Sequence, residues 1–278
     1  MVNEVTVSVI IPCYNQGEYI EEAIQSVLDS TFKNIEIVVV NDGSTDKFTN
    51  ELLNNYNRPK TKVITIQNQG VSIARNIGIQ NSSAKYILPL DADDKISSTY
   101  IEKAVSVLEN NDDIKVVCCE VECFGARKGR KALSEPTIEM LLGENTMVVT
   151  SMFRRADFNK TKGFNPNMIF GFEDWDFWLS MAELGGYFHK INTVGVYYRI
   201  NKRSRNLTIS NEHKTILRRQ IYENHKGLYS NHFFDPTNSF EYKYIYFSKE
   251  YFIGKIILKP VRRFYKILSG LLYYGRYC

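Results

Sequence analysis

The stretch Tyr86-Ile87-Leu88-Pro89-Leu90-Asp91-Ala92-Asp93-Asp94 joins an apolar run directly to three carboxylates. The apolar part is predicted to be a buried strand. Carboxylates this close together repel each other and raise each other's pKa unless a cation neutralises them. Mg²⁺ and Mn²⁺ prefer oxygen ligands, and they often share one or two carboxylates with substrate phosphates. Read alone, the stretch predicts either a metal site or an Asp-rich turn that caps the next helix.

Strands and helices alternate on both sides of this stretch. Apolar runs predict strands at 5–11, 35–40, 62–67 and 86–90, and helical spacing predicts helices at 20–28, 70–78 and 100–108. The alternation predicts an α/β fold, with a mostly parallel sheet flanked by helices. In such sheets ligands bind beyond the carboxyl ends of the strands, where Asn15, Asp42 and Asp91 are expected to meet.

Composition gives the broad class. The chain has 278 residues, of which 44% are hydrophobic and 24% charged, as expected for a soluble globular protein. A signal peptide is not recognisable, and no apolar stretch reaches the roughly 18 residues of a membrane span. These features predict a cytoplasmic protein, and we expect no nucleic-acid partner. The five cysteines lack zinc-site spacing and are predicted to be buried free thiols.

The C-terminal tail carries the basic character of the chain. Residues 242–278 contain eight Lys or Arg residues and one acidic residue, Glu250, whereas the net charge of the whole chain is only +4. Aromatic and aliphatic residues recur there at helical spacing beside the cations. We predict a helical extension at 211–278 that binds an anionic membrane surface, peripherally on the cytoplasmic face of the inner membrane. The alternative is packing against the domain or a second subunit, which leaves the oligomeric state open.

A second acidic cluster, Glu173-Asp174-Trp175-Asp176, begins a predicted helix. Acidic residues favour the positive end of a helix, and one of them is equally suited to act as a general base facing a cavity. Between the two clusters, the run 147–153 is predicted to be a strand, and the basic run 127–131 a solvated loop.

Five motifs in this order resemble the inverting family 2 glycosyltransferases of the GT-A fold, including bacterial enzymes of cell-surface polysaccharide synthesis. They are Val7-Ser8-Val9-Ile10-Ile11-Pro12-Cys13-Tyr14-Asn15, Val40-Asn41-Asp42-Gly43-Ser44-Thr45-Asp46, Asn68-Gln69-Gly70-Val71-Ser72-Ile73-Ala74-Arg75-Asn76, the Asp91 cluster and Phe172-Glu173-Asp174-Trp175-Asp176. The resemblance covers about residues 5–205. It implies a catalytic domain at 1–210, with a nucleotide-binding half at 1–95 and an acceptor-binding half at 96–210.

The resemblance implies a set of residues that contact the nucleotide sugar: Pro12, Tyr14, Asn15, Glu18, Asp42, Gly70, Arg75, Asp91, Ala92 and Arg199. Asp42 would accept a hydrogen bond from uracil, the alternative being a cap on its own turn or the next helix. Arg75 would lie near the diphosphate, the alternative being a surface ion pair. Arg199, with Lys202 or Arg203, would close over the diphosphate.

The same resemblance implies the catalytic chemistry. Asp93 would bind Mn²⁺ or Mg²⁺ together with Asp91, and Asp174 would be the general base. Glu173 would support the acceptor or the base, and Asp176 would cap the helix. Trp175, like Trp178, would either stack on a sugar or belong to the core. The sequence departs from the family pattern at Ser180, where Arg is frequent, and at Asn201, where His is frequent.

The predicted activity is transfer of a sugar, from a donor expected to be a UDP-sugar, to a hydroxyl of a saccharide or lipid-linked saccharide. A non-catalytic sugar-nucleotide or carbohydrate-binding protein of the same fold is the main alternative. A sugar nucleotidyltransferase is disfavoured because its Gly-rich phosphate loop is missing. A dinucleotide-dependent oxidoreductase is disfavoured because no Gly-rich fingerprint follows the first strand.

Overall fold

The computed structural model describes residues 6–201 and 209–232. The chain forms two compact units, Met1–Asn224 and His225–Cys278. The first unit contains the whole sheet and helix α9 (Asn211–Asn224), and the described part of the second contains α10 (Lys226–His232). Of the extension predicted at 211–278, residues 211–232 are described and contain α9 and α10, and residues 233–278 lie outside the described residues. Within residues 6–201 and 209–232, no helix combines the length and apolar character needed to cross a membrane.

One sheet runs through the first unit, in the order β3-β2-β1-β4-β8-β6-β9-β5, with β7 paired to β6. Its strands are β1 (Val7–Cys13), β2 (Ile35–Asp42), β3 (Thr61–Ile66), β4 (Tyr86–Pro89), β5 (Lys95–Ile96), β6 (Ile114–Gly125), β7 (Gly129–Lys131), β8 (Met152–Arg154) and β9 (Tyr187–Ile200). The first four in this order pair in parallel. Strand β8 is antiparallel to both β4 and β6, whereas β6 and β9 are parallel. The predicted α/β fold with flanking helices is confirmed, and the N-terminal half of its sheet is entirely parallel, whereas the second half is mixed.

Helices cover both faces of this sheet. They are α1 (Gly17–Leu28), α2 (Lys47–Asn54), α3 (Val71–Gln80), α4 (Tyr100–Asn110), α5 (Ile138–Gly143), α6 (Arg155–Phe158) and α7 (Glu173–Ala182). On one face, residues of α1 and α4 join alternate residues of β1 and β2 in a buried apolar cluster. This alternation follows the two-residue period of a strand, which sends successive side chains to opposite faces.

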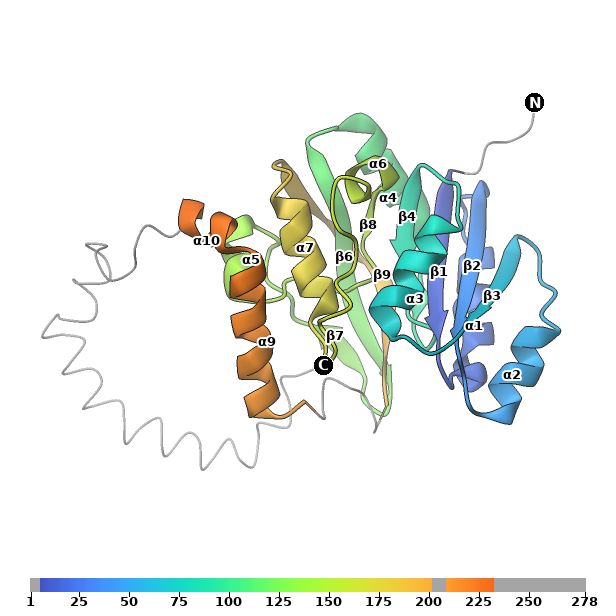
Figure 1. The fold of residues 1–278 in the computed structure, drawn as a ribbon. Coiled ribbons are helices and arrows are strands. Elements are labelled where there is room, and N and C mark those ends of the chain that lie inside the picture. The colour runs from blue at the N-terminus through green and yellow to red at the C-terminus, as the bar shows by residue number, and fades with distance from the viewer. Residues whose placement is uncertain (1–5, 202–208, 233–278) are drawn as a thin grey trace, which may run out of the picture. The chain divides into compact units, whose positions relative to one another are not determined.

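On the other face lie α3 and α7, which Figure 1 shows in front of the sheet. Helix α3 approaches closely because Gly78 has no side chain: a Cβ there would lie 2.5 Å from Ile10 Cγ2. Helix α7 packs through Phe177, whose ring centroid is 5.1 Å from that of Phe153 and 4.4 Å from that of Phe164. The aromatic core therefore fixes where α7 begins relative to the sheet.

The second half differs in detail from the prediction. The apolar run 147–153 is buried, but only Met152–Arg154 forms a strand. The run 127–131, predicted to be a loop, contributes strand β7, whose Arg130 pairs with Glu120 at 2.7 Å. Cys13, Cys118, Cys119 and Cys123 are free and buried, as predicted. Burial raises the pKa of the Cys118 thiol well above its usual range, which leaves it unreactive.

Candidate active site

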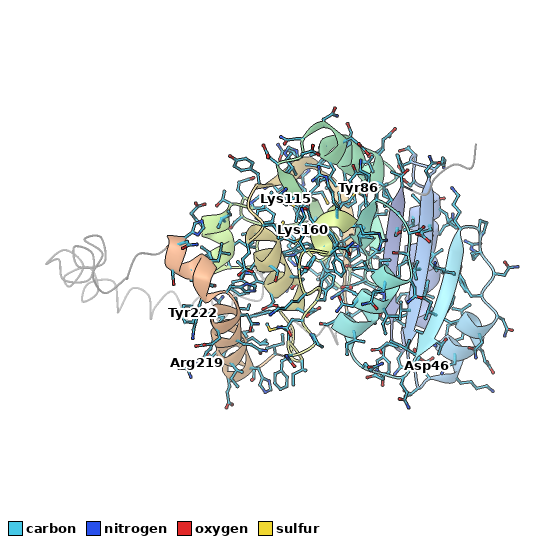
Figure 2. The ribbon with its side chains drawn as sticks, turned by 45° about the horizontal axis from the view of Figure 1, so that its top comes forward. Asp46, Tyr86, Lys115, Lys160, Arg219 and Tyr222 are labelled. Carbon is cyan, nitrogen blue, oxygen red and sulfur yellow. The ribbon has the colours of Figure 1, made fainter. Side chains whose placement is uncertain are left out.

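The carboxyl ends of β2, β1 and β4 lie side by side, because these parallel strands are neighbours in the sheet. Asn15 follows β1 in the left-handed region (φ 54°). Its side-chain oxygen accepts hydrogen bonds from the backbone N–H groups of Thr45 at 2.7 Å and Asp46 at 3.1 Å. Asp46, labelled in Figure 2, caps α2 by accepting from Thr49 N at 2.7 Å. Asn15 thus shapes the rim of the predicted nucleotide pocket.

Asp42 is buried, with 3% exposure, at the end of β2. One carboxylate oxygen accepts from Gln69 N at 2.8 Å, and the other accepts from Gly70 N at 2.9 Å. Gly70 has φ 91° and ψ 160°, a conformation that favours glycine. Asp42 therefore holds the loop that leads into α3. Its proposed contact with uracil would use the remaining lone pairs.

Arg75 is a buried bridge between the two acidic clusters. Its Nη2 lies 2.7 Å from Asp91 Oδ1, and its Nη1 lies 2.8 Å from Glu173 Oε1. The side chain is 2% exposed, and the guanidinium lies over the Phe164 ring. Burial opposes the charge, but the two carboxylates outweigh it and raise the pKa of Arg75. Both ion pairs are therefore internal to the domain, whereas the alternative considered above was an ion pair on the surface.

Strand β9 holds the Asp91–Asp94 turn from the other side. Arg199 donates from its backbone N to Asp94 Oδ1 and from Nε to Asp93 O, both at 2.8 Å. The Asn201 amide donates to Asp93 Oδ2 at 3.1 Å. Arg199 also pairs with Glu22 of α1 at 3.0 Å. The position at which the family often has His is thus occupied by a neutral partner of Asp93.

The negative charge of this turn is only partly neutralised by Arg75, which pairs with Asp91, and by Arg199, which lies close to Asp93. Burial and the charge of Asp91 raise the pKa of Asp93 to about 6. Burial, with the charges of Asp91 and Asp93, raises the pKa of Asp94 well above its usual range. Among the described residues, no group of three His, Cys, Asp or Glu side chains could hold a metal ion by itself. Two carboxylates, Asp91 and Asp93, that repel each other despite these cations fit a hard metal ion that takes its other ligands from substrate phosphates and water.

Asp174 lies in the first turn of α7. The preceding chain turns sharply, with φ 127° at Gly171 and φ 62° at Phe172. Its Oδ1 accepts from Trp175 N at 2.8 Å, and its Oδ2 accepts from Asn145 Nδ2 at 3.0 Å. Burial first, and then the charge of Glu173, raise the pKa of Asp174 to about 6, while Arg75 opposes the rise. A carboxylate with such a pKa can take a proton near neutral pH.

The other predicted residues of this motif have structural contacts. Trp175 is 2% exposed, and its Nε1 donates to Leu141 O at 2.6 Å. Trp178 is also buried, so the structure favours the core role for both rings. Asp176 accepts from Asn224 Nδ2 at 2.7 Å, which ties α7 to α9.

Comparison with known proteins decides the family. The model of glycosyl transferase family 2 matches residues 8–226. The chain belongs to this family. An uncharacterised glycosyltransferase of Haemophilus influenzae is 33% identical over 198 residues, which are 64% of this chain and 61% of that protein. Glycosyltransferase GlyA of Streptococcus pneumoniae is 39% identical over 40% of this chain, but only 16% of GlyA is covered. The chain thus spans less than two thirds of these relatives.

Solved structures agree on the fold. Residues 1–349 of S. aureus TarS, crystallised with UDP-GlcNAc, match with a TM-score of 0.62 and 18% identity, covering 84% of this chain and 75% of that one. The TarS structure with UDP gives a TM-score of 0.60. The predictions of a family 2 glycosyltransferase and of the GT-A fold are confirmed. The roles of the individual residues stay predictions.

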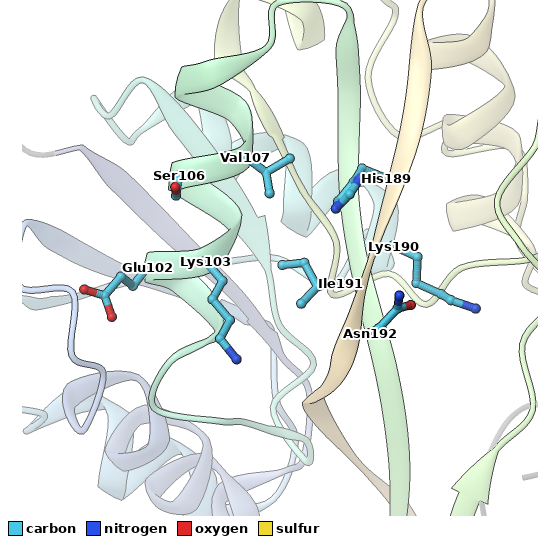
Figure 3. Close-up of a pocket in the computed structure, with 8 residues that line it drawn as sticks. All are labelled: Glu102, Lys103, Ser106, Val107, His189, Lys190, Ile191 and Asn192. Atoms are coloured by element: carbon cyan, nitrogen blue, oxygen red, sulfur yellow. The ribbon is translucent and has the colours of Figure 1, made fainter.

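In this family 2 domain, the nucleotide-side residues differ in exposure. Tyr14, Asn15 and Glu18 are exposed at the end of β1 and the start of α1, whereas Pro12 and Ala92 are buried. Lys202 and Arg203 lie outside the described residues. A cavity of about 520 Å³ lies between α4 and β9, lined by Glu102, Lys103, Ser106, Val107, His189, Lys190, Ile191 and Asn192 (Figure 3). It contains none of the predicted site residues, and we assign it no role.

Sequence reasoning missed two partners of the family 2 motifs. Asn145 contacts Asp174 across 29 positions of sequence, and Glu22 contacts Arg199 from α1. Asn145 follows the turn Gly143-Glu144 and is an ordinary loop residue by type. Glu22 lies on an exposed turn of α1, where a carboxylate is unremarkable. Neither residue belongs to a recognisable motif, so only the fold shows its position.

Proposed function

We propose that this protein is an inverting glycosyltransferase that moves a sugar from a nucleoside-diphosphate sugar to a hydroxyl of a saccharide or lipid-linked saccharide. One observation carries the proposal: Arg75 links Asp91, in the turn after β4, to Glu173, the neighbour of Asp174. A site for an anionic leaving group and a candidate base are thereby held by one buried side chain. A single displacement needs a base and a leaving-group site on opposite sides of the reacting carbon, and the link supports a site in which both lie close to one donor.

The base would act on the acceptor. Asp174 would accept the proton of the acceptor hydroxyl while that oxygen attacks the anomeric carbon and the bond to the diphosphate breaks. Each oxygen of Asp174 uses one hydrogen bond, so each keeps a lone pair for an incoming O–H. One displacement inverts the anomeric configuration, and the proton remains on Asp174 until product release.

The donor would bind over the strand ends. The TarS complex with UDP-GlcNAc supports a UDP-sugar, with Tyr14, Asn15 and Gly70 around the nucleotide. Asp93 and Asp91 would hold Mn²⁺ or Mg²⁺, which when bound would neutralise charge on the departing nucleoside diphosphate. Since Arg75 pairs with two carboxylates, its role would be to hold Asp91 in place. Arg199 would hold the Asp93 backbone and favour the ionised form of its carboxyl.

The acceptor and its pathway are proposed by family resemblance, as cell-surface polysaccharide synthesis. Residues 233–278 would bring the enzyme to an anionic membrane on which such an acceptor is carried. A truncation after residue 232 should lose cosedimentation with phosphatidylglycerol vesicles and keep its affinity for UDP. Equal sedimentation of the full and truncated chains would contradict the membrane role.

The activity itself is tested by incubating UDP- and dTDP-sugars with Mn²⁺ and measuring release of the nucleoside diphosphate. Asp174→Asn and Asp93→Ala should each lower turnover by about 10²-fold to 10⁴-fold, a range typical of acid–base groups. Lys47→Met, which changes an exposed residue of α2, is the matched control. Full turnover by both site variants would reject the proposed assignment.

A further inference from the structure

The segment between β7 and β8 reaches the candidate base from outside the family 2 motifs. Its helix α5 begins at Thr137, whose hydroxyl accepts from Met140 N at 3.3 Å. Trp175 Nε1 donates to Leu141 O, and Arg218 Nη1 of α9 donates to Gly143 O at 3.1 Å. The segment is therefore anchored to α7 and α9 directly before Asn145.

Both ends of the Asn145 amide are engaged. Its Oδ1 accepts from Met147 N at 3.4 Å, and its Nδ2 donates to Asp174 Oδ2 at 3.0 Å. The contact with Met147 fixes which end of the amide faces Asp174. Because Trp175 N holds the other carboxylate oxygen, the plane of the Asp174 carboxylate is set by two donors from two segments.

We propose that Asn145 is a positioning residue for Asp174, which orients the carboxylate toward the acceptor and stabilises its ionised form. The inference rests on the proposed function, in which Asp174 is the general base. Asn145 donates without bringing a charge, so it can hold the carboxylate without forming a salt bridge that would suppress its basicity. A cation at this position would bind the carboxylate more tightly and lower its pKa further.

The groups around Asp174 decide whether its pKa should rise or fall when Asn145 is replaced. Glu173, its neighbour on α7, raises the pKa of Asp174, and Arg75 of α3 lowers it. The Asn145 hydrogen bond also lowers it, because it favours the charged form. Loss of Asn145 should therefore raise the pKa of Asp174, and a negative charge at position 145 should raise it more.

The test measures the titration of Asp174 directly, in the full chain and without a ligand. Aspartate ¹³C-carboxyl NMR, assigned with Asp174→Asn, should give a midpoint near 6 for the wild type. The midpoint should be higher in Asn145→Ala and higher still in Asn145→Asp, which is close in shape and guards against misfolding of the alanine variant. Asn110→Ala, which changes an exposed amide on α4, should leave it unchanged. An unshifted midpoint in both folded Asn145 variants would overturn the inference.

A second readout separates positioning from general support of the fold. With the donor selected by the sugar panel, Asn145→Ala should lower kcat by about 10-fold to 100-fold, as for a lost hydrogen bond to a charged group. The acid limb of its pH profile should move to higher pH, and UDP affinity should not change. An equal loss at every pH would contradict positioning. If Asp174→Asn kept full activity, the proposal that Asp174 is the general base would be rejected instead, whatever the NMR result.

Discussion

Removing the Arg75 bridge is the sharpest test of how this site is built. In Arg75→Met the side-chain volume is roughly kept, but Glu173 and Asp91 lose the guanidinium at 2.8 and 2.7 Å. Breaking a buried ion pair from one side typically costs about 3–5 kcal/mol, because the remaining charge stays buried. The Glu173 side chain is 11% exposed, whereas that of Asp91 is 32% exposed and can regain water. We therefore expect the lower end, about 3 kcal/mol of unfolding free energy.

The chain supplies its own probe for this measurement. Both of its tryptophans, Trp175 and Trp178, lie on α7, directly after Glu173. Urea unfolding followed by tryptophan fluorescence therefore reports on the helix that Arg75 holds. A loss of about 3 kcal/mol corresponds to a Tm lower by about 6–12 °C for a domain of this size.

A matched control is Lys47→Met, which breaks the exposed i,i+4 pair with Glu51 and should cost less than about 0.5 kcal/mol. Adding Glu173→Gln to Arg75→Met should make the protein no less stable, because the second change removes the charge that the first left unpaired. The reasoning is refuted if Arg75→Met unfolds at the wild-type urea concentration, or if Glu173→Gln adds its full cost to that of Arg75→Met.

Three further predictions follow from single contacts. Because the folded-state pKa of Asp174, about 6, exceeds its ordinary 3.8, stability should fall as pH rises from about 4 to about 6, and Asp174→Asn should remove this part of the pH dependence; urea titrations in which the variant keeps the same fall would contradict this. Asp42→Asn would offer only one acceptor oxygen to the two backbone N–H groups of Gln69 and Gly70. It should therefore lower the unfolding free energy by about 1–3 kcal/mol and also weaken UDP binding. Calorimetry that showed weaker UDP binding with unchanged stability would assign the carboxylate to the nucleotide alone. Gly70→Ala should lower the unfolding free energy by about 1–3 kcal/mol through backbone strain alone. A Cβ at this position would meet nothing within 4 Å, so no clash contributes. An unchanged Tm in thermal unfolding would reject the strain.

The sequence was sufficient for the first half of the fold because local pattern and tertiary structure agree there. Strands β1, β2 and β4 are continuous apolar runs, and α1 and α3 show helical spacing between them. In the second half the apolar run 147–153 is buried, but only its last two residues, Met152 and Phe153, belong to a strand, which ends at Arg154. Apolar character predicted burial correctly at this position, but it does not distinguish a strand from a buried loop. Strand direction also depends on connections that the pattern does not show, so the antiparallel β8 was not foreseen.

For the site, the sequence identified the charged residues but not their partners. Asp42, Arg75, Asp91 and Asp174 were all singled out by motif. Their contacts join distant positions, such as Arg75 to Glu173 across 98 residues, and depend on how α3 and α7 pack on the same face. A motif predicts which side chain is needed, whereas the partner is decided by packing. This is why the motif did not show that Arg75 lies between two carboxylates.

That difference changes how the two acidic motifs are understood. Without the ion pairs of Arg75, the Asp91 turn and the start of α7 would be independent parts of the candidate site. With one guanidinium bound to both Asp91 and Glu173, a change in charge at either carboxylate alters the field at the other. Asp174 lies next to Glu173 and responds to Arg75, so its affinity for a proton depends on the state of the donor side. The base and the leaving-group site are therefore expected to act as one electrostatic unit, although they are far apart in sequence.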